Sequence, residues 1–79
     1  IIPGGADLEY VYKISPQAIN YIREFVQAGN SYLGICAGAY FASAQVIFEP
    51  GKSWQVIGDR PLSLFPGIAY GSALRPFSY

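Results

Sequence analysis

Residues 31–43 constrain the fold of this chain more than any other stretch. An apolar run typical of a strand, residues 31–35, leads directly into Cys36 and then into an alanine-rich run that favours a helix. Gly34 and Gly38 stand two residues to either side of the cysteine, and glycine at both positions permits the close approach of strand and helix that a sharp turn requires. The Gly-x-Cys-x-Gly spacing therefore predicts a nucleophile elbow, in which the turn lifts a reactive side chain clear of a sheet.

The composition indicates strands that are covered on both faces. The chain has 79 residues, of which 52% are hydrophobic and only 13% are charged, and a chain this short buries roughly 60% of the surface that it exposes when unfolded. It contains no methionine, and Ile1-Ile2 followed by Pro3-Gly4-Gly5 is typical of a strand that ends in a loop. We therefore expect residues 1–79 to be one partial domain of a longer chain.

The charges and the single cysteine exclude several classes of function. Five basic and five acidic residues are scattered singly, so we expect no nucleic-acid partner. The apolar runs are far shorter than the roughly 18 residues that span a bilayer, so we expect no membrane partner. With one cysteine and no histidine, the sequence predicts neither a metal site nor an internal disulfide. A cytoplasmic location is the expectation.

The first half of the chain contains one strong helix signal. Ser15 is a typical N-cap, Pro16 suits the first helical position, and Gly29 suits the C-terminal end. One face of this helix is apolar, at the positions Ala18, Ile19, Ile22, Phe25 and Val26. The pattern predicts an amphipathic helix packed on a sheet, whereas residues 8–14 alternate loosely and predict an extended arm or irregular lid.

The order of these elements predicts a β-α-β unit. Ile1-Ile2 forms one strand, the helix is the crossover, and residues 31–35 form a parallel strand. Parallel strands end at the same edge of a sheet, which is where ligands bind in open α/β folds. We therefore expect the Gly4-Gly5 loop to lie beside Cys36.

The second half is predicted from apolar runs and turn residues. We expect a helix over residues 37–46, a strand over 53–57, a turn at 59–61 and an apolar segment over 62–70 that Pro66-Gly67 interrupts. Trp54 and residues 62–65 are expected in the core. Residues 71–79 are expected to be irregular.

Cys36 is the candidate catalytic nucleophile. Backbone amides at a helix N-terminus favour the thiolate, and the N–H of Ala37 with that of Gly4 or Gly5 would form an oxyanion hole for attack on an amide or ester carbonyl. A Cys-His pair would need a histidine from outside these residues, because the chain has none. The alternative is that Cys36 is a small buried apolar residue.

Asp7 and Tyr10 are weaker candidates for the mouth of a substrate pocket. An aspartate in a loop is more often solvated or caps a turn. The ligand that we expect at this pocket is a small amide or carboxylate.

Two motifs resemble a known family. Pro3-Gly4-Gly5 and the sequence from Gly34 to Gly38 resemble the class I glutamine amidotransferase-like superfamily. The sequences of residues 2–8 and 32–43 are similar to the amidotransferase-like N-terminal domain of eukaryotic-type biotin-protein ligases. Residues 65–67, Gly71 and residues 77–79 resemble the part of that domain that follows.

This resemblance implies an α/β, flavodoxin-like three-layer fold with a parallel sheet, of which residues 1–79 are a part. It implies the nucleophile at Cys36 and the oxyanion loop at Gly4-Gly5. It places biotin transfer, with ATP and biotin as cofactors, in a separate domain of the parent protein, and it implies no cofactor for this chain. The histidine and glutamate of the catalytic amidotransferases do not occur here, and Gly71-Ser72 departs from the family's Gly-Pro.

Three functions remain open at this point. The first is a binding or regulatory amidotransferase-like domain of a biotin-protein ligase, and the second is a Cys-dependent amidase or glutaminase-type hydrolase. The third is a structural module whose apolar faces dock on the rest of the parent chain.

Overall fold

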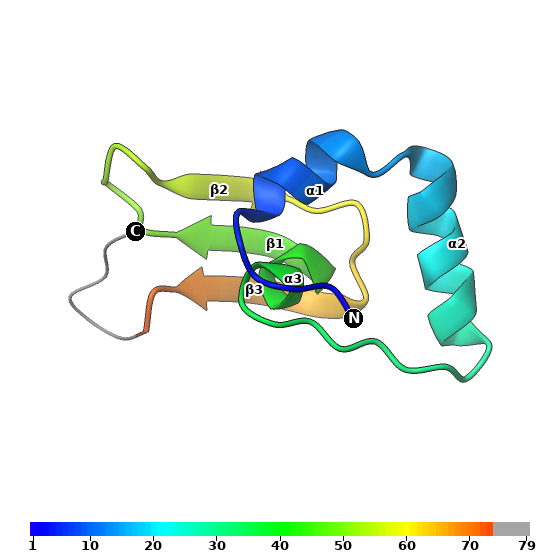
Figure 1. Ribbon diagram of the computed structural model, residues 1–79. Coiled ribbons are helices and arrows are strands. Elements are labelled where there is room, and N and C mark those ends of the chain that lie inside the picture. Colours follow the sequence, from blue (N-terminus) through cyan, green and yellow to red (C-terminus); the bar gives the residue numbers. More distant parts are fainter. Residues whose placement is uncertain (74–79) are drawn as a thin grey trace.

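The computed structural model describes residues 1–73, which form a small α/β structure. In chain order the elements are α1 (Asp7–Lys13), α2 (Pro16–Gln27), α3 (Ala37–Ala42), β1 (Ser43–Phe48), β2 (Val56–Asp59) and β3 (Phe65–Gly71). The strands form one sheet in the order β2-β1-β3, in which α3 lies against β1 and β3, while α2 stands beyond the ends of the strands (Figure 1).

The sheet is mixed. β1 pairs antiparallel with β2 and parallel with β3. A parallel sheet was expected, and the structure confirms a parallel pair within a sheet that also contains an antiparallel one. The expected pairing of the two N-terminal strands is present as a single parallel bridge, in which Ile2 N–H donates to Leu33 O at 2.9 Å and Ile35 N–H donates to Ile2 O at 3.0 Å.

Helix α2 begins as the sequence predicts. The Ser15 side chain accepts a hydrogen bond from the Ala18 N–H at 3.2 Å, Pro16 occupies the first turn, and Gly29 follows the helix with a φ of +100°. The helix does not pack on the sheet, however. Its buried residue Ile19 joins a core cluster with Phe41, Ala42 and Leu62, so α2 covers the junction of α3 with the loop that precedes β3.

Residues 8–14 form a helix rather than the expected extended arm. Asp7 and Glu9 lie in the first turn of α1 and Lys13 lies in its last turn, which complements the helix dipole. Glu9 and Lys13 also form an ion pair one turn apart, at 2.9 Å. These charge positions explain why a loosely alternating segment is helical.

The expected helix over residues 37–46 was wrong beyond Ala42. The chain turns extended at Ser43, whose hydroxyl donates to Ala39 O at 3.2 Å, and continues as β1. Val46, Ile47 and Phe48 favour a strand when neighbouring strands can pair with them. Here β2 and β3 supply that pairing on both sides.

The later expectations need smaller corrections. The strand expected over residues 53–57 begins only at Val56, because residues 53–54 form a turn, and β2 then includes Asp59, which was expected in a turn. Strand β3 runs through Pro66 and Gly67 because it is an edge strand whose pairing with β1 contains a register shift at that point. Leu62 is fully buried as expected, but Trp54 is 44% exposed and Phe65 is 58% exposed. Of the expected irregular tail, residues 74–79 lie outside the described part of the chain.

One face of the sheet carries exposed apolar side chains. The register places Ile47 between Ile57 of β2 and Tyr70 of β3, and Ile68 lies two residues before Tyr70 on the same face. Ile57, Ile68 and Tyr70 are each more than half exposed, and no helix of residues 1–73 packs on them. We call these four residues the open face.

Candidate functional site

Cys36 occupies the turn between the Gly34 bridge and α3. It is the N-cap residue of α3, its side chain is exposed, and its backbone has φ +55° and ψ −111°. A non-glycine residue in this region is sterically strained, and such strain is concentrated at functional sites. The thiol is accessible, so the alternative of a buried apolar cysteine was wrong.

The two flanking glycines permit the turn because each lies against the backbone of another residue and leaves no room for a side chain. A Cβ at Gly34 would lie 2.6 Å from the carbonyl carbon and oxygen of Gly38, and a Cβ at Gly38 would overlap the carbonyl oxygen of Ile2. Both positions are therefore closed to any side chain. The steric reason predicted for the two glycines is confirmed.

The Gly4-Gly5 loop lies beside Cys36, as the parallel pairing predicts. A Cβ built on Gly4 would lie 3.4 Å from the Cys36 Cβ, while Gly5 has φ +128° and open space around its Cα. Among residues 1–73, the N–H groups of Gly5 and Ala37 make no hydrogen bond to the backbone. These two N–H groups were predicted as oxyanion donors; no backbone acceptor of the described residues engages them, and their role as donors stays a prediction.

Tyr10 supports this loop from α1. Its hydroxyl lies 2.8 Å from the Pro3 carbonyl oxygen and 3.2 Å from that of Gly4, to which it can donate. Its ring packs against Phe41 with the centroids 5.6 Å apart. Tyr10 therefore binds the backbone of the loop, which differs from the expected place at the mouth of a pocket.

Tyr32 supports the other half of the site and was missed from the sequence. Its hydroxyl donates to the Gly38 carbonyl oxygen at 2.6 Å, which fixes the first turn of α3. Burial, with a smaller contribution from Tyr10, raises the pKa of Tyr32 above its ordinary value. The only sequence signal was its place in the strand that precedes Cys36, where it reads as one more apolar residue.

Asp7 lies at a pocket, but its carboxylate is already paired. Arg60 Nε donates to Oδ2 at 2.5 Å and Nη2 donates to Oδ1 at 3.3 Å, and both side chains are buried. Arg60 Nη1 also donates to the Asp59 carbonyl oxygen at 2.8 Å. Arg60 was expected only as part of a turn over residues 59–61, and nothing local in the sequence indicates its pairing with Asp7.

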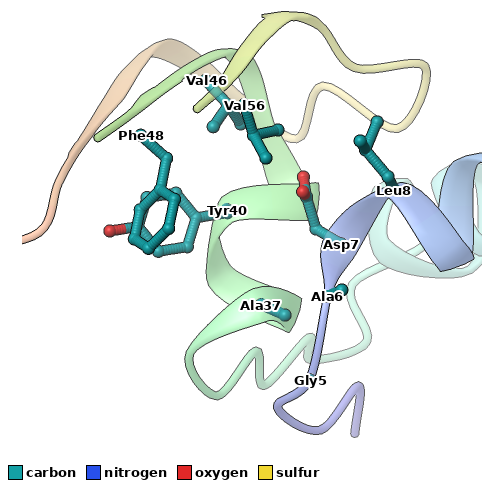
Figure 2. Close-up of a pocket in the computed structure, with 9 residues that line it drawn as sticks. All are labelled: Gly5, Ala6, Asp7, Leu8, Ala37, Tyr40, Val46, Phe48 and Val56. Carbon is teal, nitrogen blue, oxygen red and sulfur yellow. The ribbon is translucent and has the colours of Figure 1, made fainter. Parts of the chain in front are cut away.

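The pocket beside Gly5 and Ala37 has a volume of about 60 Å³. Figure 2 shows the Asp7 carboxylate directed toward Val56, with the rings of Tyr40 and Phe48 farther along the same side and Leu8 on the opposite side. The residues that line it come from the first loop and α1, from α3 and from the strands: Gly5, Ala6, Asp7, Leu8, Ala37, Tyr40, Val46, Phe48 and Val56. The walls are mainly apolar, and Cys36 lies outside them.

The described residues, 1–73, contain neither a cluster of metal ligands nor a helix that could cross a membrane. Within residues 1–73, no group of three or more histidine, cysteine, aspartate or glutamate side chains is arranged to hold a metal ion. No helix in that part of the chain has the length and apolar character needed to cross a membrane.

The fold and the site define a small α/β domain with an exposed cysteine at a strained turn that leads into a helix. Over residues 1–79 the sequence matches the family model described as biotin-protein ligase, N terminal. The chain belongs to this family of N-terminal domains of biotin-protein ligases.

Two relatives cover the whole chain. It is 40% identical over 80 residues to a biotin–protein ligase of Schizosaccharomyces pombe, and 41% identical over 80 residues to an uncharacterized protein of Chlamydia muridarum. The chain spans 13% of the length of the first and 31% of the length of the second. No solved structure matches the sequence significantly.

Proposed function

We propose that this chain is an amidotransferase-like domain with a binding or regulatory role in a biotin-protein ligase. The observation that carries the proposal is a nucleophile elbow without a base. Cys36 is exposed at a strained turn beside Gly4, yet the 79 residues contain no histidine to form a Cys-His pair. Such a site has the geometry that receives a carbonyl group, while residues 1–79 supply no histidine to act as the base.

The lengths of the relatives support a module that is separable from the ligase reaction. The same 80 aligned residues make up 31% of the chlamydial protein but only 13% of the yeast ligase, so the chlamydial protein is less than half as long. The occurrence of this domain in chains of such different size supports a role of its own. On this proposal the complete domain has the flavodoxin-like three-layer fold, with the open face covered by the rest of its own chain.

ATP and biotin belong, on this proposal, to another part of the parent protein. The pocket beside Gly5 does not fit either group, because about 60 Å³ is well below the roughly 150 Å³ that holds a single benzene ring. Arg60, which does not line the pocket, is engaged with the Asp7 carboxylate and does not remain available for a phosphate. A cytoplasmic location is part of the same proposal.

The test is the rate of biotin transfer by the full-length protein that contains this chain. Cys36→Ala is expected to leave kcat and the KM for biotin within about twofold of wild type. Gly4→Ala, which adds a methyl group next to the thiol, serves as a second variant of the same site. A large loss of kcat in Cys36→Ala, with unchanged circular dichroism and melting temperature, would contradict a non-catalytic role.

A second candidate is a Cys-dependent amidase or glutaminase-type hydrolase. The free N–H groups of Gly5 and Ala37 beside an exposed thiol favour it, since attack on an amide needs donors for the developing oxyanion. A histidine from outside residues 1–79 would have to supply the base. Release of ammonia from glutamine or simple carboxamides by the full-length protein, abolished by Cys36→Ala, would establish this function in place of the first.

A further inference from the structure

The Gly4-Gly5 loop spans two fixed points of the structure. On one side, Ile2 is hydrogen-bonded to the strand that precedes Cys36, and on the other, Asp7 is buried. Between these points both glycines are exposed. No atom beyond its chain neighbours lies within 4 Å of the place where a Cβ of Gly5 would stand. Packing alone therefore leaves the loop weakly held.

The Tyr10 hydroxyl supplies the hydrogen bonds that hold this loop. Among residues 1–73, the backbone of residues 3–5 makes no hydrogen bond to other backbone groups. The Tyr10 hydroxyl lies 2.8 Å from the Pro3 carbonyl oxygen and 3.2 Å from that of Gly4, and no other side chain in that part of the chain bonds to residues 3–5. A loop with two glycines has many conformations open to it, so its position depends on this one hydroxyl.

Tyr10 is itself fixed against the helix that follows Cys36. Its ring packs on Phe41 of α3 with the centroids 5.6 Å apart, and Phe41 is fully buried. Gly4, in turn, lies beside the cysteine, because a Cβ built on Gly4 would be 3.4 Å from the Cys36 Cβ. The core therefore positions Tyr10, Tyr10 positions the loop, and the loop forms one wall beside the exposed thiol.

We propose that Tyr10 is a positioning residue for Cys36, whose hydroxyl holds the Gly4-Gly5 loop against one side of the thiol and so limits the size of the molecule that reaches it. The inference deepens the proposed binding role, on which it rests, by naming what controls access to that site. It needs neither a base nor an activated thiol, because it concerns only the space around the sulfur atom.

The experiment compares two alkylating reagents on the full-length protein. Iodoacetamide and its bulkier N-phenyl derivative, iodoacetanilide, both react when the thiolate displaces iodide. Mass spectrometry of the peptide that contains Cys36 gives the rate with each reagent. At one pH the thiolate fraction enters both rates and cancels in their ratio. The ratio of the iodoacetanilide rate to the iodoacetamide rate therefore measures the space beside the thiol.

Tyr10→Phe removes the hydroxyl and keeps the ring that packs on Phe41. Loss of one neutral hydrogen bond favours a displaced loop by about fivefold. The iodoacetanilide rate should rise by the same factor, while the iodoacetamide rate changes little because the thiol is already exposed. Tyr12→Phe, at a position 77% exposed on the same helix, is the matched control and should leave the ratio unchanged. Gly4→Ala adds a methyl group beside Cys36 and should lower the ratio.

An unchanged ratio in Tyr10→Phe would overturn the inference. Rates that rise by the same factor for both reagents would also overturn it, because they indicate a general loosening of the fold. So would a ratio in Gly4→Ala equal to that of wild type, and this variant decides the question even where Tyr10→Phe fails to fold. None of these rates involves biotin transfer, so their outcome is distinguishable from the Cys36→Ala test of the proposed function.

Discussion

Asp7, the first residue of α1, is held by Arg60, which follows β2 and lies 53 residues later in the chain. Two hydrogen bonds join the carboxylate to the guanidinium group, and both side chains are buried. The pair connects the loop that carries Gly4 and Gly5 to the end of the sheet. The position of the candidate site therefore depends on an interaction between the two halves of the chain.

Breaking this pair is expected to destabilise the protein strongly. Asp7→Leu leaves the Arg60 cation buried without its partner and should lower the free energy of unfolding by about 3–5 kcal/mol. The double variant Asp7→Leu/Arg60→Met should recover most of that loss, because it removes both charges. Lys13→Ala, which breaks the exposed pair with Glu9, should cost about 0.3 kcal/mol in the same urea titration. Equal losses for the two single variants would contradict the assignment.

Alanine at either elbow glycine is expected to disrupt the turn. At Gly38 the new Cβ would overlap the Ile2 carbonyl oxygen, and at Gly34 it would lie 2.6 Å from backbone atoms of Gly38. Backbone cannot move aside as a side chain can, so each change should cost about 3 kcal/mol or more. Gly4→Ala is the control, since its Cβ would make an ordinary contact of 3.4 Å with Cys36. Melting temperatures of the three variants check this ranking.

Replacing Cys36 separates backbone strain from chemistry. Cys36→Gly should be more stable than Cys36→Ala by about 1 kcal/mol, because glycine adopts φ +55° and ψ −111° without steric cost. Replacing alanine by glycine within α3, in Ala39→Gly, should instead lower the free energy of unfolding by about 1 kcal/mol. If glycine at position 36 were less stable than alanine, the turn would not be strained in solution.

The hydroxyl of Tyr32 predicts a pH dependence. The pKa of Tyr32 is raised in the folded protein above the value of about 10 in the unfolded chain. The contribution of the Tyr32 hydroxyl to the free energy of unfolding is therefore complete below pH 10. That contribution is lost as the pH rises through the folded-state pKa, since the unfolded chain then binds fewer protons. Tyr32→Phe should cost about 1 kcal/mol at pH 8 through loss of the bond to Gly38.

The difference between wild type and Tyr32→Phe should therefore shrink above pH 10. Urea titrations at pH 8 and pH 10.5 measure it. Tyr12→Phe, at a position 77% exposed, should match wild type at both pH values. If the difference in unfolding free energy between wild type and Tyr32→Phe were the same at pH 8 and pH 10.5, the predicted pH dependence of Tyr32 would be wrong.

The effect of Ile57→Ala on stability should depend on whether the open face is covered. In the 79-residue chain, Ile57→Ala should change the free energy of unfolding by no more than about 0.5 kcal/mol because the side chain is exposed. In the longer protein, where we propose that the face is covered, the same change should cost about 2–5 kcal/mol. Val46→Ala, buried already, should destabilise both forms. Equal small effects of Ile57→Ala in both would contradict the proposed covering.

The local sequence was sufficient to predict helix α2 and the turn at Cys36. Ser15, Pro16 and Gly29 act within one helical turn of their own positions, and Gly34 and Gly38 act through their lack of a Cβ. The parallel pairing of Ile2 with Gly34 followed from the order of the elements. The neighbourhood of Gly4 and Cys36 was therefore predictable, because parallel strands end at one edge.

Tertiary structure decided the rest, since it depends on partners distant in sequence. Residues 43–46 have alanine and glutamine that suit a helix, but pairing with β2 and β3 makes them a strand. The local sequence predicts Asp7 to be a solvated loop residue, whereas the fold pairs it with Arg60, 53 positions away. Both cases have one physical reason: hydrogen bonds and burial gained between distant segments outweigh the weak preferences of each segment alone.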